Sequence, residues 1–240
     1  MENVLITGAN KGIGFEVAKQ LAQKGYFVFM GCRNIEKGHA AVEQLHHQHI
    51  RNVDCIEIDV SSNESVAKAF GELSSKIDRL DVLVNNAGIV ESFAQNPTTI
   101  ELQLIDKLIE TNFKGAVRTT QKFLDLLKNS SNPRIVNVSS DMGSLTLQSD
   151  YDWEHAHLKP LGYMASKASL NAFTISLAYE LREANFKVNS VNPGATATDL
   201  NHHMGSRTPE FAAQVIVKAA TVDKEGPSGK FFDEDGELPW

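Results

Sequence analysis

Short apolar runs alternate with longer amphipathic segments along the chain. Several of the runs are almost entirely apolar, as strands covered on both faces should be. The longer segments carry apolar residues at helical spacing. In the first of them, Ile13, Val17 and Leu21 recur every four residues and form one stripe. This alternation predicts βαβ units and therefore an α/β fold with a parallel sheet.

Seven strands and six helices follow from this pattern. The strands are expected at Val4–Ile6, Tyr26–Met30, Asp54–Ile58, Asp81–Val84, Arg134–Val138, Phe186–Ser190 and Lys230–Phe232. The helices are expected at about Gly14–Lys24, Ile35–His49, Ser62–Ile77, Thr99–Asn129, Tyr163–Ala184 and Pro209–Ala220. No linker and no internal repeat interrupts them, so we expect a single domain over residues 1–240. The stretch Gly143–Leu161, rich in Ser, Asp and His, is expected to be a loop over the carboxyl ends of the strands.

Composition narrows the partners and the compartment. The net charge is −7 and the 23 basic residues are spread along the chain, so the footprint of a nucleic-acid binder is missing. Small molecules are the expected partners. Cys32 and Cys55 are too few for a disulfide framework, which favours a reducing, cytoplasmic location. Neither a signal-type segment nor a membrane span is expected.

The first predicted strand runs directly into a glycine-rich loop and then a helix. The loop reads Thr7-Gly8-Ala9-Asn10-Lys11-Gly12-Ile13-Gly14. Three glycines at this spacing allow a tight turn, and the helix N-terminus then faces a pyrophosphate. The alternative is that the glycines serve only a turn, although a single turn rarely needs three. We therefore predict a dinucleotide site.

The end of the second strand indicates which dinucleotide is held. An NAD site carries an acidic residue there for the ribose 2′-hydroxyl, whereas an NADP site has an arginine nearby for the 2′-phosphate. This strand ends in Met30-Gly31-Cys32-Arg33-Asn34, without a carboxylate. Arg33 can form a two-pronged contact with a phosphate. Lys11 could add a second charge, and Lys37 is a weaker candidate.

Tyr163 and Lys167 stand four positions apart on a predicted helix and so lie on one face. A lysine ammonium within about 4–6 Å would lower the phenol pKa from its usual value of about 10. A tyrosine tuned in this way could exchange a proton near neutral pH. Taken alone, such a pair is more often an exposed helix contact, because the Y-x-x-x-K pattern often arises by chance.

Polar motifs follow three further strands at the same sheet edge: Asp59-Val60, Asn85-Asn86-Ala87-Gly88 and Ser139-Ser140. With these motifs the chain resembles the short-chain dehydrogenase/reductase family over essentially its whole length. It is most similar to the NADPH-dependent carbonyl reductases of that family, through Asn10-Lys11, Arg33 and the run Glu225–Phe231. The resemblance implies a Rossmann-type, doubly wound sheet of seven parallel strands.

The resemblance also assigns roles to residues. It implies a catalytic set of Asn112, Ser140, Tyr163 and Lys167, with Ser140 chosen over Ser139. For NADP(H) it implies Gly8, Asn10, Lys11, Gly12, Ile13, Gly14, Arg33, Asp59, Val60, Asn86, Ala87, Gly88, Tyr163, Lys167, Pro193, Gly194, Thr196 and Thr198. Asp59 would accept a hydrogen bond from the adenine amino group, and residues 193–198 would hold the nicotinamide carboxamide. Asn112 would hold a water that links Lys167 to solvent.

One departure from the family pattern lies beside the site. Ser140 and Tyr163 are 23 positions apart, about a dozen more than in common family members, which implies an insertion at about residues 145–161. Longer insertions here accompany monomeric carbonyl reductases, so both a homo-oligomer and a monomer stay open. The segment after Thr198 is short, which predicts a small lid. Substrate specificity is expected to reside in these two segments.

No metal site is expected. The tract His46-His47-Gln48-His49 closes a predicted surface helix, where histidine suits the negative end of the helix dipole. Zinc ligands normally come with further partners in closed geometry.

Three functions are compatible with this sequence. The first is an NADPH-dependent reductase of ketones or aldehydes. The second is a catalytically weak NADP-binding regulator or scaffold of the same fold, because fold does not fix function. The third is an NADP-dependent epimerase or dehydratase on a nucleotide sugar, for whose longer C-terminal substrate domain 240 residues leave little room.

Overall fold

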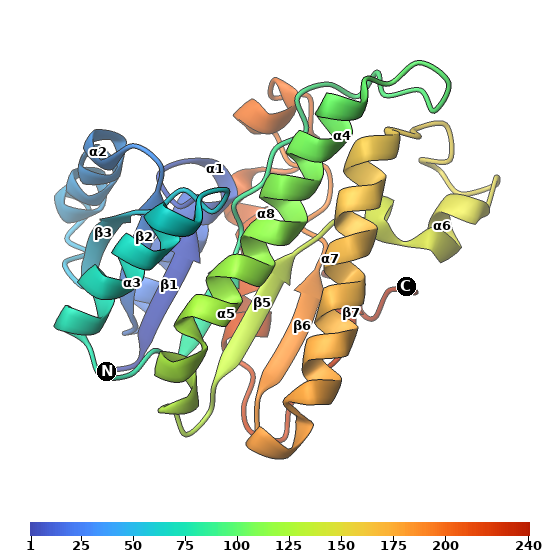
Figure 1. Ribbon diagram of the computed structural model, residues 1–240. Helices are drawn as coiled ribbons and strands as arrows, with labels where there is room; N and C mark the ends of the chain where they lie inside the picture. Colours follow the sequence, from blue (N-terminus) through green and yellow to red (C-terminus); the bar gives the residue numbers. More distant parts are fainter.

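The computed structural model describes residues Met1 to Trp240, and one sheet of seven parallel strands forms its centre (Figure 1). The strands are β1 (Asn3–Thr7), β2 (Phe27–Cys32), β3 (Val53–Glu57), β4 (Val82–Asn85), β5 (Arg134–Val138), β6 (Lys187–Val191) and β7 (Lys230–Phe232). Their order across the sheet is β3-β2-β1-β4-β5-β6-β7. The predicted Rossmann-type doubly wound fold is confirmed, and its strand order reverses between β1 and β4, where such sheets bind ligands.

Helices cover both faces of the sheet. They are α1 (Gly12–Gln23), α2 (Ile35–His47), α3 (Asn63–Lys76), α4 (Leu102–Ile109), α5 (Gly115–Lys128), α6 (Leu145–Ser149), α7 (Leu161–Glu180) and α8 (Pro209–Ala220). Helices α1, α2 and α8 lie on one face, and α3, α5 and α7 lie on the other (Figure 1). Alternate strand residues feed the two cores, because successive side chains point to opposite faces: Val4 and Ile6 join the first core, and Leu5 joins the second.

Side-chain caps explain where several helices begin. Asn34 accepts a hydrogen bond from the backbone N–H of Lys37 at 2.9 Å and starts α2. Ser62 starts α3 in the same way, through the N–H of Ser65 at 3.2 Å. Such caps satisfy amide groups that the helix itself leaves without partners. Helix α1 has no side-chain cap, so its first amides remain available to a ligand.

Two expected segments differ from the prediction. The stretch expected as one helix over Thr99–Asn129 consists of α4, a π-helical turn at Glu110–Lys114 and α5. The stretch Gly143–Leu161 is not entirely a loop, because it contains the short helix α6. Ser144 caps this helix by accepting a hydrogen bond from the N–H of Leu147 at 3.1 Å. None of the helices is both long enough and apolar enough to cross a lipid bilayer.

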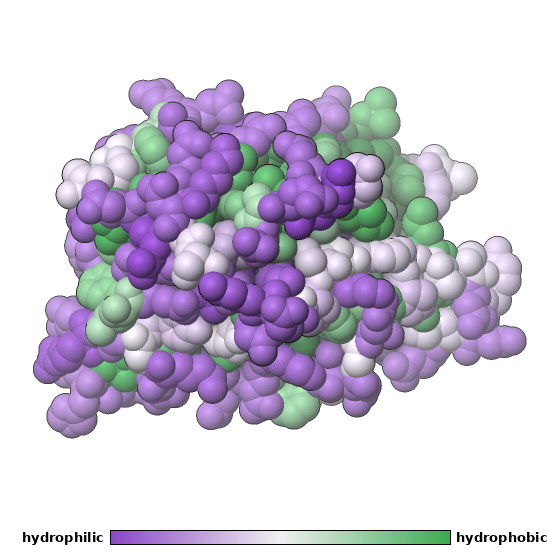
Figure 2. Space-filling model, turned by 90° about the horizontal axis from the view of Figure 1, so that it is seen from below, coloured by the Kyte–Doolittle hydropathy of each residue, from purple (hydrophilic) through white to green (hydrophobic).

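The two ends of the sheet differ in what lies over them. At the carboxyl ends of the strands, the segments around α4 and α6 rise above the sheet (Figure 1). The opposite end, seen in Figure 2, is mostly hydrophilic, with hydrophobic residues in scattered groups. The C-terminus returns to the side of α6, where the carbonyl of Trp240 accepts a hydrogen bond from the N–H of Thr146 at 3.0 Å. The additional segments of the chain therefore lie at the carboxyl end of the sheet.

Candidate active site

A cavity of about 910 Å³ lies at the carboxyl ends of the strands. Its walls come from the glycine loop, the ends of β2, β4 and β5, the insertion before α7 and the segment after β6. The residues of the sequence-based site that line it are Gly8, Asn10, Lys11, Gly12, Ile13, Gly14, Arg33, Asp59, Val60, Asn86, Ala87, Gly88, Ser140, Tyr163, Lys167, Pro193, Gly194, Thr196 and Thr198. Asn112 is the one predicted site residue that does not line the cavity.

The glycine loop is held in shape by close backbone contacts. Gly8 and Gly12 have φ angles of 67° and 58°, which favour glycine. A Cβ added to Gly14 would lie 2.5 Å from both the Gly8 carbonyl oxygen and Asn86 Nδ2. Asn86 Nδ2 donates to the carbonyls of Thr7 at 2.9 Å and Gly8 at 3.1 Å, which ties β4 to the loop. The loop and the uncapped start of α1 therefore form a cradle that fits a phosphate group.

Arg33 and Lys11 differ in what they contact at the adenosine end of the cavity. Arg33 is exposed, and its guanidinium makes neither a hydrogen bond nor an ion pair with the protein. Lys11, which we expected to add a second charge for a phosphate, instead forms an ion pair with Asp199 at 2.5 Å. The hydrogen bond and charge of Lys11 lower the pKa of Asp199, which also contacts His203 at 2.9 Å. Arg33 is therefore the free cation at this end.

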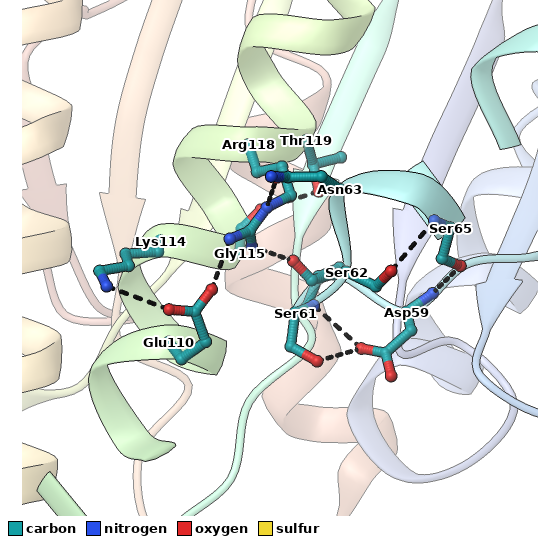
Figure 3. A network of polar contacts seen from close by, with 11 residues as sticks. Asp59, Ser61, Ser62, Asn63, Ser65, Glu110, Lys114, Gly115, Arg118 and Thr119 are labelled. Carbon is teal, nitrogen blue, oxygen red and sulfur yellow. Dashed lines mark hydrogen bonds and ion pairs between the residues drawn. The ribbon is translucent and has the colours of Figure 1, made fainter. Parts of the chain in front are cut away.

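A polar network fixes the loop after β3 (Figure 3). One oxygen of Asp59, Oδ1, accepts hydrogen bonds from the N–H of Ser61 at 2.9 Å and from its hydroxyl at 2.6 Å. Its other oxygen accepts none, so it can still receive a donor from a ligand. Arg118 of α5 contacts the Val60 carbonyl, the Asn63 side chain and the Glu110 carboxylate. Its hydrogen bond lowers the pKa of that carboxyl group.

Tyr163 and Lys167 lie in the first two turns of α7, and both are buried. Helix α7 has no side-chain cap from the residue before it. Gln95, from the segment after β4, supplies the missing acceptor: its Oε1 receives the N–H of Tyr163 at 2.9 Å. Gln95 is itself almost completely buried, and its Nε2 donates to the Val90 carbonyl at 2.9 Å. This glutamine fixes the position of the tyrosine, and no motif of the sequence pointed to it.

The pKa of Tyr163 is raised, contrary to the lowering expected from Lys167. Burial is the main cause, because the charged phenolate loses contact with water, and the nearby Asp141 carboxylate acts in the same direction. The Ser140 side chain opposes them and lowers the pKa of Tyr163. Lys167 Nζ lies 5.7 Å from the centre of the Tyr163 ring and donates to the Val138 carbonyl at 2.8 Å. Burial also lowers the pKa of Lys167 to about 8, so its charge is lost as the pH rises through that value.

Ser140 contacts groups of its own segment. Its hydroxyl donates to Asp141 Oδ1 at 3.1 Å and accepts the N–H of Met142 at 3.2 Å. Ser139 also lines the cavity, but its hydroxyl is buried and has no partner. The choice of Ser140 over Ser139 stays a prediction, supported by the Ser140 hydroxyl acting to lower the pKa of Tyr163.

Asn112 lies in the π-helical turn and braces the site from behind. Its Oδ1 accepts the N–H of Ile89 at 2.8 Å, and its Nδ2 donates to the Ile89 carbonyl and the Ser166 hydroxyl, both at 2.9 Å. A Cβ added to Gly88 would lie 3.4 Å from Asn112 Oδ1 and 3.6 Å from Lys167 Nζ, so these two side chains meet at Gly88. π-helical turns are frequent at functional sites. The water-holding role of Asn112 stays a prediction.

Residues 193–198 fold over the glycine loop. Arg207, which no sequence motif indicated, donates to the Pro193 carbonyl at 3.2 Å and to the Glu234 carboxylate at 2.6 Å. A Cβ on Gly12 would lie 3.4 Å from the Thr198 methyl group, so the two loops nearly touch. The segment after Thr198 contains one 3-10 turn, Asp199–Asn201, in line with the small lid that we expected.

The insertion before α7 supplies the remaining wall. His155 and Leu158 line the cavity. Lys159 Nζ donates to the backbone carbonyl and to Oε1 of Gln148, both at 2.7 Å, and so ties the end of the insertion to α6 at its start. Nowhere in the structure are three or more His, Cys, Asp or Glu side chains close enough together to hold a metal ion. In the histidine tract, His46 Nδ1 lies 3.8 Å from Glu43 Oε1.

Comparison with known proteins gives consistent matches. A family model described as short chain dehydrogenase matches residues 2–208. Salutaridine reductase from Papaver somniferum is 31% identical over 291 aligned positions, with 95% of this chain and 93% of that protein covered. (−)-Isopiperitenone reductase from Mentha piperita is 31% identical, with 98% of this chain and 96% of that protein covered. The structure of NADPH-bound carbonyl reductase from chicken fatty liver is similar with a TM-score of 0.86 at 27% identity, over 100% of this chain and 99% of that one.

Proposed function

Because this chain belongs to the short-chain dehydrogenase family of oxidoreductases, we propose that it reduces ketones or aldehydes to alcohols with NADPH. The observation that carries the proposal is the meeting of Ser140, Tyr163 and Lys167 at one wall of the cavity. The glycine cradle and Arg33 line the same cavity, so a single ligand can reach both regions.

The residues present fit NADP(H). The glycine loop has no side chains where an added Cβ would collide, so a phosphate group can approach its backbone. The free amides at the start of α1 can then bind a pyrophosphate. Arg33 is free to bind a 2′-phosphate, and Cys32 ends β2 where an NAD site would carry a carboxylate. The NADPH named for the chicken carbonyl reductase is in line with this cofactor. When bound, NADPH supplies the hydride.

The protein's own residues then handle the carbonyl oxygen and its proton. Tyr163, whose raised pKa keeps it protonated at neutral pH, donates its proton to the developing alkoxide. Ser140 donates a hydrogen bond to the same oxygen as negative charge builds up there. Lys167 stabilises the phenolate that remains, and its charge is lost as the pH rises through about 8. Asn112 holds the backbone and Ser166 beside this pair.

Replacing Tyr163 with phenylalanine tests this mechanism. We expect the Tyr163→Phe variant to lose carbonyl-dependent NADPH oxidation by about a thousandfold or more, because the general acid is gone, while it still binds NADPH. The assay follows NADPH absorbance with a panel of aromatic ketones, quinones, terpenoid ketones and aldehydes, and binding is measured by NADPH fluorescence. Tyr151→Phe is the control, because Tyr151 is 87% exposed on the insertion.

Two results would contradict the proposal. Retained turnover in Tyr163→Phe would remove the tyrosine from the mechanism. A wild-type protein that binds NADPH but reduces no carbonyl compound would favour the regulator or scaffold instead.

A further inference from the structure

The substrate end of the cavity combines apolar walls with several carboxylates. The apolar side chains that line this end include Val90, Phe93, Met142, Leu158 and Met204. Besides Asp59, three carboxylates line the cavity, those of Glu91, Asp141 and Asp199. Two of them have a cation partner: Glu91 pairs with Lys107 at 2.8 Å, and Asp199 pairs with Lys11.

Asp141 is the carboxylate of this group without a cation. No ion pair joins it to Lys167 or to any other basic side chain. Its Oδ1 accepts the N–H of Met142 at 2.8 Å and the hydroxyl of Ser140 at 3.1 Å, which fixes the orientation of the carboxylate. Its Oδ2 accepts no hydrogen bond. A fixed carboxylate with a free oxygen in a cavity is a binding group for a cation.

The position of Asp141 places this charge beside the reacting atoms. It follows Ser140 directly and is hydrogen-bonded to it, and its field acts on the buried hydroxyl of Tyr163. Phe93, whose ring centre is 6.5 Å from that of Tyr163, adds an aromatic wall nearby. An aromatic wall and a carboxylate together favour an organic cation over an anion.

We infer that Asp141 makes this enzyme prefer carbonyl substrates that carry a protonated amine and reject those that carry a carboxylate. The inference rests on the proposed function and names the substrate class of the same site. An ammonium group can donate a charge-assisted hydrogen bond to Oδ2. A carboxylate would face Asp141 across an apolar cavity, where like charges repel more strongly than in water.

A matched set of ketones tests the preference in the wild-type protein. Acetophenones substituted at position 3 or 4 with aminomethyl, hydroxymethyl or carboxylate groups provide a cation, a neutral analogue and an anion of similar size. With NADPH, we expect kcat/KM for the cationic ketone to exceed that for the neutral one by about tenfold, in line with one charged hydrogen bond. The carboxylate ketone should be the poorest substrate of the three.

The Asp141→Asn variant assigns the preference to this residue. Its readout is the ratio of kcat/KM for the cationic and neutral ketones, because the lost charge also acts on Tyr163 and changes both rates together. We expect the ratio to fall to about one, whereas Asp152→Asn should leave it unchanged, because Asp152 is an exposed carboxylate of the insertion that does not line the cavity.

Different results would contradict the inference and the proposed function. Equal rates for the three wild-type substrates, or an unchanged ratio in Asp141→Asn, would overturn the inference and leave the reductase function standing. A wild-type protein that reduces no ketone or aldehyde at all would overturn both.

Discussion

The two ends of the cavity are built by different means. At the cofactor end, close backbone contacts shape the site. The glycine loop, Asn86 and the start of α1 lie so close together that a Cβ added to Gly14 would collide with its neighbours. At the substrate end, the walls are segments outside the regular elements, and side-chain contacts such as Lys159 with Gln148 hold them together.

This difference explains how one fold serves many substrates. Backbone contacts at the cofactor end tolerate few side chains, so the residues there follow a recognisable spacing. Side-chain contacts at the substrate end can be exchanged without disturbing the sheet, because loops tolerate change better than the elements they connect. The cofactor end should therefore be sensitive to single substitutions, and the substrate end should respond mainly in specificity.

Gly14→Ala should have the largest effect, because it places a side chain in the crowded cofactor end of the cavity. The new Cβ would lie 2.5 Å from backbone and side-chain atoms, so the loop must shift. The free energy of unfolding should fall by about 1–3 kcal/mol, and NADPH affinity by roughly a hundredfold, or about 2.7 kcal/mol. Chemical denaturation and fluorescence titration measure the two effects.

Gly71→Ala is the control for that substitution. Gly71 lies on the exposed side of α3, and nothing is within 4 Å of its added Cβ. Alanine there should raise the free energy of unfolding by about 0.5–1 kcal/mol, because it suits a helix better than glycine. If the two variants behaved alike, the close contacts at Gly14 would not be the cause.

Arg33→Ala tests the one contact at the cofactor end that we assign to a charged side chain. Its guanidinium has no partner in the protein, so stability should not change. NADPH binding should weaken by about ten- to thirtyfold, as expected for one charged hydrogen-bonding group, while NADH binding should stay the same. Parallel titrations of the two cofactors measure the preference.

Arg51→Ala provides the matched control, because Arg51 is an exposed arginine outside the cavity. A wild-type protein that prefers NADH would contradict the role of Arg33.

Of the three test substitutions, Lys159→Met has the smallest expected effect on cofactor binding. It removes two hydrogen bonds to Gln148 in a partly buried part of the insertion, and the free energy of unfolding should fall by no more than about 1 kcal/mol. KM for the ketone substrate should change, because His155 and Leu158 of the same segment line the cavity. KM for NADPH should not change. A larger change in the NADPH value than in the ketone value would show that the two ends are not separable.

The sequence predicted the elements that carry a regular pattern of apolar residues and the motifs whose residues are close together in the chain. Apolar runs located all seven strands to within two residues, because buried parallel strands must be apolar on both faces. The glycine spacing and Tyr163 with Lys167 were found because their chemistry depends on residues close together in the sequence. The short helix α6 was missed, since five residues show no clear period.

What could not be predicted depends on residues that are distant in the sequence. Gln95 caps α7 across 68 positions, and Arg118 reaches the loop after β3 across 58. The direction of the pKa shift of Tyr163 required knowing how completely the ring is buried. Helical spacing gives the proximity of a lysine, but it does not show that desolvation exceeds the effect of its charge.

The π-helical turn at Glu110–Lys114 joins α4 to α5 and sets the rotation of one helix relative to the other. The turn accommodates one extra residue, which rotates α5 by about 100° relative to α4 compared with an uninterrupted α-helix. Leu108 of α4 and Phe123 of α5 are both fully buried. Asn112 sits at this seam, with its amide on Ser166. Loss of a single residue here would restore an ordinary helix and turn Asn112 away, so this stretch should resist length changes that neighbouring loops accept.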